Sequence, residues 1–214
     1  VNNDATRVEV NTISAEMAKV RDYVPDYAVM AHRGSTFWAP EETESAWRWA
    51  REMGADYLES DLQCTKDGVI LANHDDNLKR TTNIENVYSE LVPATRKAFY
   101  MRHGVSEEEA EKLVAADKAS FRPYYAMSYM YEELLALDAG SWFNETSIEQ
   151  ARKSFAEKHQ YVSALEDQIR YAEGKMLKRG SDGERIYTVT GTWDPDKPRD
   201  CLTYKFEYVD DPQD

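Results

Sequence analysis

The chain has few cysteines, no long apolar run and a shortage of positive charge. Its 214 residues include two cysteines, Cys64 and Cys201, which are too few for a disulfide framework, and no Cys-x-x-Cys pair is present for zinc or redox chemistry. No run of about 18 apolar residues occurs, so no bilayer-spanning helix and no stable membrane insertion are expected. The 26 lysines and arginines stand against 40 aspartates and glutamates, a formal net charge of −14. This balance argues against nucleic acids and anionic membrane surfaces as partners.

The motifs of several large enzyme classes are also absent. The sequence has no P-loop, no G-x-G-x-x-G, no G-x-S-x-G and no H-E-x-x-H. Its 42% hydrophobic and 12% aromatic residues are nevertheless enough to form a core, so a folded protein of one domain or two small ones is expected. The polar N-terminus is compatible with a periplasmic or secreted location and with a cytoplasmic one.

The first part of the chain predicts an α/β fold. The short apolar segment at residues 27–31 predicts a buried strand. Residues 56–62 and 69–73 predict two further strands, the last one after a tight turn. Between the first two strands, a helix is expected to begin at Thr43 and to end at Gly54. Strand, helix and strand in this order are typical of a fold with parallel strands.

The pattern changes after the third strand. Residues 83–139 predict a mostly helical, acidic block that is inserted into the scaffold, with a helix capped by Ser106 and Glu109. Further helices are expected to begin at Ser147, and at Ser163 with Glu166 as its capping partner.

The last forty residues predict little regular structure. Residues 175–200 suggest a long loop that holds one strand near Ile186, and residues 202–209 alternate enough to form a single strand.

Two carboxylates on the second predicted strand are candidates for a metal site. Glu59 and Asp61 are two residues apart, so both side chains point to the same face of a strand. Their repulsion is naturally compensated by Ca²⁺ or Mg²⁺, which prefer oxygen ligands. The alternative is a pair of solvated charges on an edge strand.

Two histidines are candidates for proton transfer. His32 and His74 each follow a short apolar run, and the carboxyl ends of strands are where parallel α/β folds place ligands and catalysis. One could act as general base and the other as general acid, whereas each alone is also compatible with a structural role. Arg33 offers a planar fork for a phosphate, and Asp75 either orients His74 or merely follows the turn.

Together, these ordered motifs resemble the glycerophosphodiester phosphodiesterase family. The likeness is dense over residues 28–82 and looser over residues 134–173. In chain order, the motifs are His32-Arg33-Gly34, Pro40-Glu41-Glu42-Thr43, Gly54-Ala55-Asp56, Glu59-x-Asp61, Thr65-Lys66-Asp67-Gly68, His74-Asp75 and Leu137-Asp138-Ala139-Gly140-Ser141-Trp142-Phe143.

The resemblance implies a (β/α)₈ TIM barrel, a divalent cation (Ca²⁺ or Mg²⁺) and hydrolysis of small glycerophosphodiesters to sn-glycerol 3-phosphate and an alcohol. It also implies that His32 and His74 are the acid/base pair, that Arg33 binds the phosphate, and that Glu59 and Asp61 are metal ligands. In a chain of net charge −14, a cation and Arg33 would reverse the local sign for an anionic substrate.

The sequence departs from the family pattern in two respects. Glu42 stands where the family's Pro-Glu-Asn-Thr motif has asparagine. The third metal carboxylate of the family lies in a Glu-x-Lys motif, whereas here Glu173-Gly174-Lys175 falls at a predicted helix end and Glu207 lacks the lysine.

The chain is also short for an eight-unit barrel, since one strand-helix unit takes roughly 30 residues. Residues 27–214 are therefore expected to be the N-terminal part of an incomplete barrel domain. Residues 1–26 are expected to be a separate segment that leads into it. Two carboxylates alone should hold the cation weakly, and an open half-barrel would favour pairing with a second copy.

Two other functions are compatible with the same residues. The first is a non-catalytic module that binds glycerol phosphates. The second is a related phospholipase that acts through a cyclic phosphate, for which the tyrosine-rich stretch at residues 121–131 would supply an apolar entrance. Such an aromatic stretch is also typical of a buried core.

Overall fold

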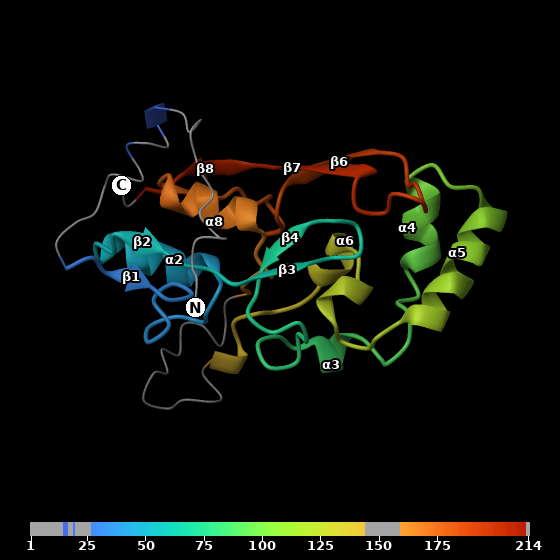
Figure 1. Cartoon of the computed structure of the whole chain (residues 1–214), viewed down its shortest axis with the longest axis horizontal. Coiled ribbons are helices and arrows are strands. Elements are labelled where there is room, and N and C mark those ends of the chain that lie inside the picture. Colours follow the sequence, from blue (N-terminus) through green and yellow to red (C-terminus); the bar gives the residue numbers. More distant parts are fainter. Residues whose placement is uncertain (1–14, 17–18, 20–26, 144–158, 213–214) are drawn as a thin grey trace, which may run out of the picture.

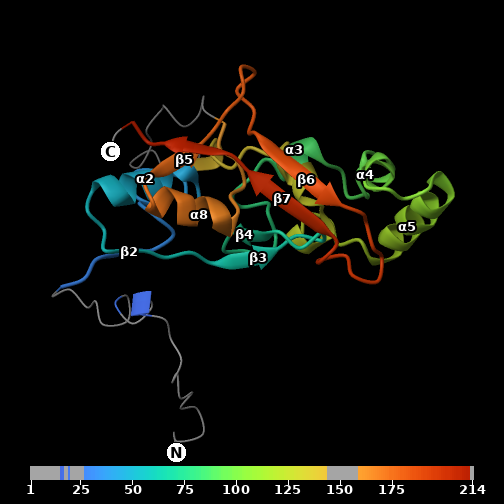
Figure 2. The same ribbon diagram turned by 90° about the horizontal axis from the view of Figure 1, so that it is seen from above.

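Residues 27–143 and 159–212 of this computed structural model, together with residues 15–16 and 19, are described. The N-terminal segment 1–26 and the helix predicted from Ser147 therefore lie almost wholly outside the described residues. The described chain is elongated, with β1, β2, α2 and α8 toward one end and α4 and α5 at the other (Figures 1 and 2). Among these residues, no helix has the length and apolar character needed to cross a bilayer.

The chain opens with a strand-helix-strand unit. β1 (Met30–Ala31) and β2 (Tyr57–Leu58) pair in parallel, as predicted, and α2 (Glu44–Glu52) connects them. α2 begins after Thr43, whose hydroxyl donates to the carbonyl of Pro40 (2.7 Å) instead of capping the helix, and it is followed by Gly54 at φ +81°. The helix is amphipathic because most of its buried residues are apolar (Ala46, Trp47 and Ala50), while the buried Glu44 accepts from the amide of Leu177 (3.2 Å).

Two predictions about the early strands are wrong. The segment 27–31 is not buried, since Tyr27 is 98% and Met30 63% exposed, because β2 is the only strand beside β1 among the described residues. The segment 56–62 is not one strand. It breaks after β2 because the amide of Asp61 donates to the Glu42 side chain (2.9 Å) rather than to a neighbouring strand.

A tight hairpin follows the break. β3 (Leu62–Cys64) pairs antiparallel with β4 (Ile70–Ala72), around a turn at residues 65–68 that the sequence predicts. The third strand is therefore not parallel to its predecessor, since a tight turn can only return the chain antiparallel. Gly68 has φ +90°, and a side chain there would overlap the carbonyl oxygen of Arg199.

The segment predicted to be helical is helical, although its role as an insertion stays a prediction. The hydroxyl of Ser106 accepts from the amide of Glu109 (3.3 Å), which confirms this end of the longest helix. The elements are α3 (Ile84–Val87), α4 (Arg96–Arg102), α5 (Glu107–Ser120), the 3₁₀ helix η2 (Ala126–Ser128) and α6 (Tyr131–Leu134).

The C-terminal part holds more strands than the sequence predicts. After α8 (Leu165–Ala172), β5 (Lys175–Leu177) pairs antiparallel with β8 (Tyr208–Asp210), and β6 (Tyr187–Gly191) pairs antiparallel with β7 (Leu202–Phe206). β5 lies in the segment predicted to be loop.

Two local details of this part also differ from the prediction. The single strand expected at 202–209 breaks at Glu207, whose amide donates to the carbonyl of Ile186 (3.0 Å). α8 is capped one residue later than predicted, because the carboxylate of Asp167 accepts from the amide of Ala164 (2.7 Å).

The strands form four separate two-stranded sheets among the described residues. The α/β class is therefore observed, but these residues do not close a barrel. The (β/α)₈ arrangement stays a prediction.

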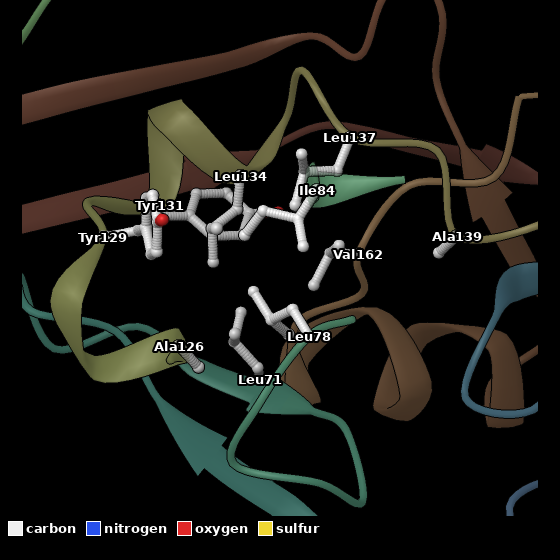
Figure 3. Packing of buried hydrophobic residues seen from close by; sticks show 10 residues of the cluster. All are labelled: Leu71, Leu78, Ile84, Ala126, Tyr129, Tyr131, Leu134, Leu137, Ala139 and Val162. Carbon is white, nitrogen blue, oxygen red and sulfur yellow. The ribbon is translucent and has the colours of Figure 1, made fainter. Parts of the chain in front are cut away.

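The largest apolar cluster joins the hairpin to the helical segment. Figure 3 shows its side chains converging from β4, α3, α6 and the segments beside them. Tyr129 and Tyr131 are fully buried in it, so the tyrosine-rich stretch contributes to the core. The ten residues are Leu71, Leu78, Ile84, Ala126, Tyr129, Tyr131, Leu134, Leu137, Ala139 and Val162.

A buried ion pair fixes the C-terminal strands against α8. Arg185 donates to Asp167 (Nη1 to Oδ2, 2.9 Å), and the two side chains are 1% and 0% exposed. The same carboxylate accepts from the hydroxyl of Tyr208 (2.6 Å), while Arg185 also donates to the hydroxyl of Tyr131. One pair therefore connects α8, β8, α6 and the segment before β6.

Replacing Asp167 by asparagine should lower the free energy of unfolding by about 3–5 kcal/mol, because the guanidinium of Arg185 would stay buried without a counter-charge. Urea unfolding at pH 7 measures the change. The matched control is Asp196→Asn, at an exposed position, which should change stability by less than about 0.5 kcal/mol. A loss below about 1 kcal/mol in Asp167→Asn would contradict the structural weight given to this pair.

Candidate functional site

The segment His32-Arg33-Gly34 forms a turn directly after β1. Arg33 and Gly34 have φ +55° and +88°, and the amide of Gly34 donates to the carbonyl of Ala31 (3.1 Å). A Cβ atom on Gly34 would lie 2.7 Å from the Cβ of Ala46 in α2. Glycine is therefore required for this turn to approach the helix, and the turn leaves His32 exposed at the strand end.

Glu59 and Asp61 lie beside this turn. His32, Glu59 and Asp61 each contribute one potential ligand atom, and these three atoms lie within 4.8 Å of one another. No other such group of three occurs among the described residues. The amide of Arg33 donates to Oε2 of Glu59 (3.0 Å), so the backbone of the turn orients one of the two carboxylates.

The chemistry of the two carboxylates, Glu59 and Asp61, fits a divalent cation. Ligands on opposite sides of Ca²⁺ or Mg²⁺ are separated by roughly 4–5 Å, and both ions prefer carboxylate oxygens. Oδ2 of Asp61 is buried and lies 2.8 Å from Nε of Arg33, so a cation here would share this oxygen with the guanidinium.

The guanidinium of Arg33, the predicted phosphate ligand, contacts two carboxylates. Its Nε atom is 2.8 Å from Asp61 and its Nη1 atom is 3.4 Å from Glu41. These contacts hold the guanidinium next to the candidate cation site, while its role toward phosphate stays a prediction.

His74 follows β4 and contacts the carboxylate of Asp75 through Nδ1. The alternative that the sequence leaves open is thus resolved in favour of an orienting contact. Arg80 donates to Asp75 through Nε (2.7 Å), and this hydrogen bond is the main reason why the pKa of Asp75 is lowered to about 2.

Sequence reasoning missed Arg80 and Glu41. Arg80 also donates to Glu41 through two nitrogens (2.7 and 3.1 Å), and Glu41 in turn contacts Arg33. A line of ion pairs therefore runs from His74 to Asp61. Glu41 belongs to a quoted motif, whereas no local pattern marks Arg80 as a partner of a residue 39 positions away.

Glu42 binds the segment that carries the carboxylates of Glu59 and Asp61. Its own carboxylate accepts from the hydroxyl of Ser60 (2.7 Å) and from the amide of Asp61 (2.9 Å). The residue is 4% exposed and has φ +58°, a conformation that asparagine adopts more readily. Burial, with the neighbouring charges of Asp61 and Glu59, raises the pKa of Glu42 from 4.5 to about 7.

Glu42→Gln should remove a pH dependence of stability. A carboxyl whose pKa is higher in the folded chain binds a proton on folding, so wild-type stability falls as the pH rises from about 4.5 to about 7. The variant should exceed the wild type by about 3 kcal/mol above pH 7 and match it near pH 4.5. Glutamine keeps both contacts, since its oxygen accepts from Asp61 and its nitrogen donates to Ser60.

Urea unfolding between pH 4 and 8 in the presence of EDTA measures this difference, because a bound cation would lower the pKa of Glu42. Glu90→Gln, at an exposed position, is the control and should follow the wild-type curve. Parallel curves for Glu42→Gln and the wild type would refute the shifted pKa.

Arg80→Gln should raise the pKa of Asp75 by at least about one unit toward its ordinary value, because the strongest charged donor is lost. Carboxyl NMR signals followed through a pH titration report this pKa directly. The control Lys79→Gln removes an adjacent cation that pairs with Glu85 instead. An unshifted Asp75 in Arg80→Gln, or an equal shift in the control, would contradict the assigned contact.

Relatives of known kind match the same part of the chain. Residues 32–193 match the sequence model of the glycerophosphoryl diester phosphodiesterase family. The glycerophosphoinositol inositolphosphodiesterase of Mus musculus is 28% identical over 165 residues, 74% of this chain and 25% of that protein. The glycerophosphodiester phosphodiesterase of Bacillus subtilis is 30% identical over 126 residues, 59% of this chain and 30% of that protein.

Two solved structures are similar over part of their length. The glycerophosphodiester phosphodiesterase from Agrobacterium tumefaciens is 27% identical with a TM-score of 0.42, over 69% of this chain and 43% of that one. A phosphodiesterase from Oleispira antarctica, in complex with sn-glycerol-3-phosphate, is 23% identical with a TM-score of 0.43, over 68% and 40%.

The chain spans about a quarter to a third of the length of the curated relatives it matches. The family match itself, residues 32–193, covers well over half of this chain and includes every residue of the site. The protein therefore belongs to the glycerophosphoryl diester phosphodiesterase family.

Proposed function

We propose that the protein hydrolyses glycerophosphodiesters to sn-glycerol 3-phosphate and an alcohol with the help of a divalent cation. The observation that carries the proposal is the convergence of His32, Glu59 and Asp61 within 4.8 Å in a chain of this family. The names of the relatives from Bacillus subtilis and Mus musculus support the reaction class.

In this proposal, Glu59 and Asp61 hold the cation, either Ca²⁺ or Mg²⁺. When bound, the cation would polarise a non-bridging phosphoryl oxygen and offset the negative charge of the phosphate. His32 stands next to the two carboxylates, but an imidazole is a poor ligand for such oxygen-preferring ions. We therefore assign His32 to proton transfer rather than to the cation.

The two histidines divide the proton transfers. His32 takes a proton from the attacking water, whose oxygen forms the new bond to phosphorus, and His74 protonates the oxygen of the departing alcohol. The contact of Nδ1 with Asp75 fixes the ring of His74 and leaves Nε2 for this transfer. Arg80 is a positioning residue, since it reaches His74 only through Asp75.

Arg33 binds the phosphate in this proposal. Its guanidinium is already oriented by Asp61 and Glu41, so little side-chain entropy is lost when a phosphate oxygen replaces one of these contacts. We also propose that the parallel pair β1–β2 with its connecting helix α2 is one unit of a (β/α)₈ barrel.

Release of sn-glycerol 3-phosphate from glycerophosphocholine tests the function. The wild type should release product with Ca²⁺ or Mg²⁺ and none with EDTA. His32→Ala and His74→Ala should each lower kcat by roughly a hundredfold or more. His103→Ala, on α4 and outside the site, is the control and should keep the wild-type rate.

The carboxylates are tested in the same assay. Glu59→Gln should raise the cation concentration needed for half-maximal activity. Binding of glycerol phosphate that is lost in Arg33→Gln, without hydrolysis under either cation, would instead identify a non-catalytic binding module. Near-normal rates in both histidine variants would refute the acid/base assignment.

A further inference from the structure

A second polar cavity lies far along the hairpin from the candidate active site. Its volume is about 250 Å³. It is open to solvent and is lined by the turn of the hairpin, the end of α5, η2 and the segment around residue 199. Its lining includes the side chains of Lys66, Arg96, Asp117, Phe121, Arg122 and Arg199.

The cavity is separate from the site at the other end of the same hairpin. Asp61 precedes β3, whereas Lys66 lies in the turn that follows it. Five residues of extended chain span about 16 Å, at about 3.3 Å per residue. α5 also lies at the end of the molecule opposite β1 and β2 (Figures 1 and 2).

The base of the cavity is a buried ion pair whose charges are already balanced. Arg96 is fully buried and donates through Nη1 to Oδ2 of Asp117 (2.6 Å). Lys66 is 2.9 Å from the other oxygen of Asp117, and Arg96 also donates to Glu133 (2.7 and 2.9 Å). Asp117 is thus neutralised without help from any residue at the rim.

The rim carries two further cations that have no counter-charge. Arg122 and Arg199 are exposed, and neither side chain makes an ion pair or hydrogen bond with a residue that the structure describes. Arg122 is held in place by stacking on the ring of Tyr125 (4.3 Å to the centroid). Each guanidinium therefore keeps all five of its N–H donors for a ligand.

The local charge runs against that of the whole chain. Asp117 and Glu133 balance the charges of Lys66 and Arg96. Arg122 and Arg199 therefore leave two positive charges in excess around the cavity, in a chain of net charge −14. The C-terminal end of α5 carries a partial negative charge of about half an elementary charge. The two positive charges of Arg122 and Arg199 exceed it, so the cavity stays positive. The hydroxyl of Ser120 already donates back to carbonyls of this helix end.

We propose that this cavity is a second anion site that binds a phosphate group, either as inorganic phosphate or as a phosphomonoester. Arginine forks match phosphate oxygens, and the volume admits a phosphate group with a short organic substituent. The ring of Phe121 supplies an apolar wall for that substituent. The proposal does not depend on the hydrolytic function.

Calorimetric titration of the protein with inorganic phosphate and with glycerol phosphate, in EDTA and at low salt, tests the site. EDTA removes any cation that would help the candidate active site to hold phosphate. We expect one binding event whose affinity falls with added salt. The double variant Arg122→Gln/Arg199→Gln should weaken it at least about tenfold, since two charge-assisted donors are lost.

Two control variants locate the binding. Arg102→Gln/Arg170→Gln removes two other arginines, each of which pairs with surface carboxylates, and should leave the affinity unchanged. Arg33→Gln tests whether the candidate active site holds the phosphate instead. Loss of phosphate binding in Arg33→Gln but not in Arg122→Gln/Arg199→Gln would place the phosphate in the candidate active site and overturn the proposal.

Vesicles distinguish the source of the phosphate group. Flotation with phosphatidylcholine vesicles that contain phosphatidate, which carries a phosphomonoester, should show binding that depends on Arg122 and Arg199 if a lipid headgroup is the ligand. Binding of soluble phosphates alone would assign a free ligand. The single variants serve if the double variant fails to fold, and no binding in any arm would refute the site.

Discussion

Acidic side chains crowd the candidate site, and their mutual repulsion is the constraint that the surrounding structure has to satisfy. Arg33 and Arg80 stand between the carboxylates of Asp61, Glu41 and Asp75, so that charges of opposite sign alternate along one line. This order fixes the positions of side chains that come from three separate segments. Each half-exposed pair contributes little to stability on its own, and its effect is to set geometry.

Buried charged groups in this protein are stabilised in two other ways. Arg185 and Asp167 are almost fully buried, so breaking that pair is costly, and their network ties together elements that share no sheet. Among the residues that the structure describes, no cation contacts the Glu42 carboxylate, and burial stabilises its protonated form instead. Ion pairing and proton uptake are thus two solutions to the same electrostatic problem within one site.

Local signals predicted the elements that local chemistry determines. The helix between Thr43 and Gly54 and the turn at residues 65–68 are both observed, although the side chain of Thr43 does not cap the helix. The break between β2 and β3 depends on the bond from Asp61 to Glu42, 19 positions away, which no sequence period reveals. The same applies to the site: the cluster of predicted ligands forms, whereas Arg80 could be placed only by the fold.

The glycine at the hairpin turn has a mechanical consequence. The backbone of residue 199 packs so closely on Gly68 that not even one added carbon atom would fit between them. The turn and the segment that carries Arg199 are therefore in direct backbone contact, and both line the cavity at the far end of the hairpin. Any substitution at Gly68 would push the backbone of residue 199 away and disturb the turn of the hairpin. His74, at the other end of the hairpin, would be less affected.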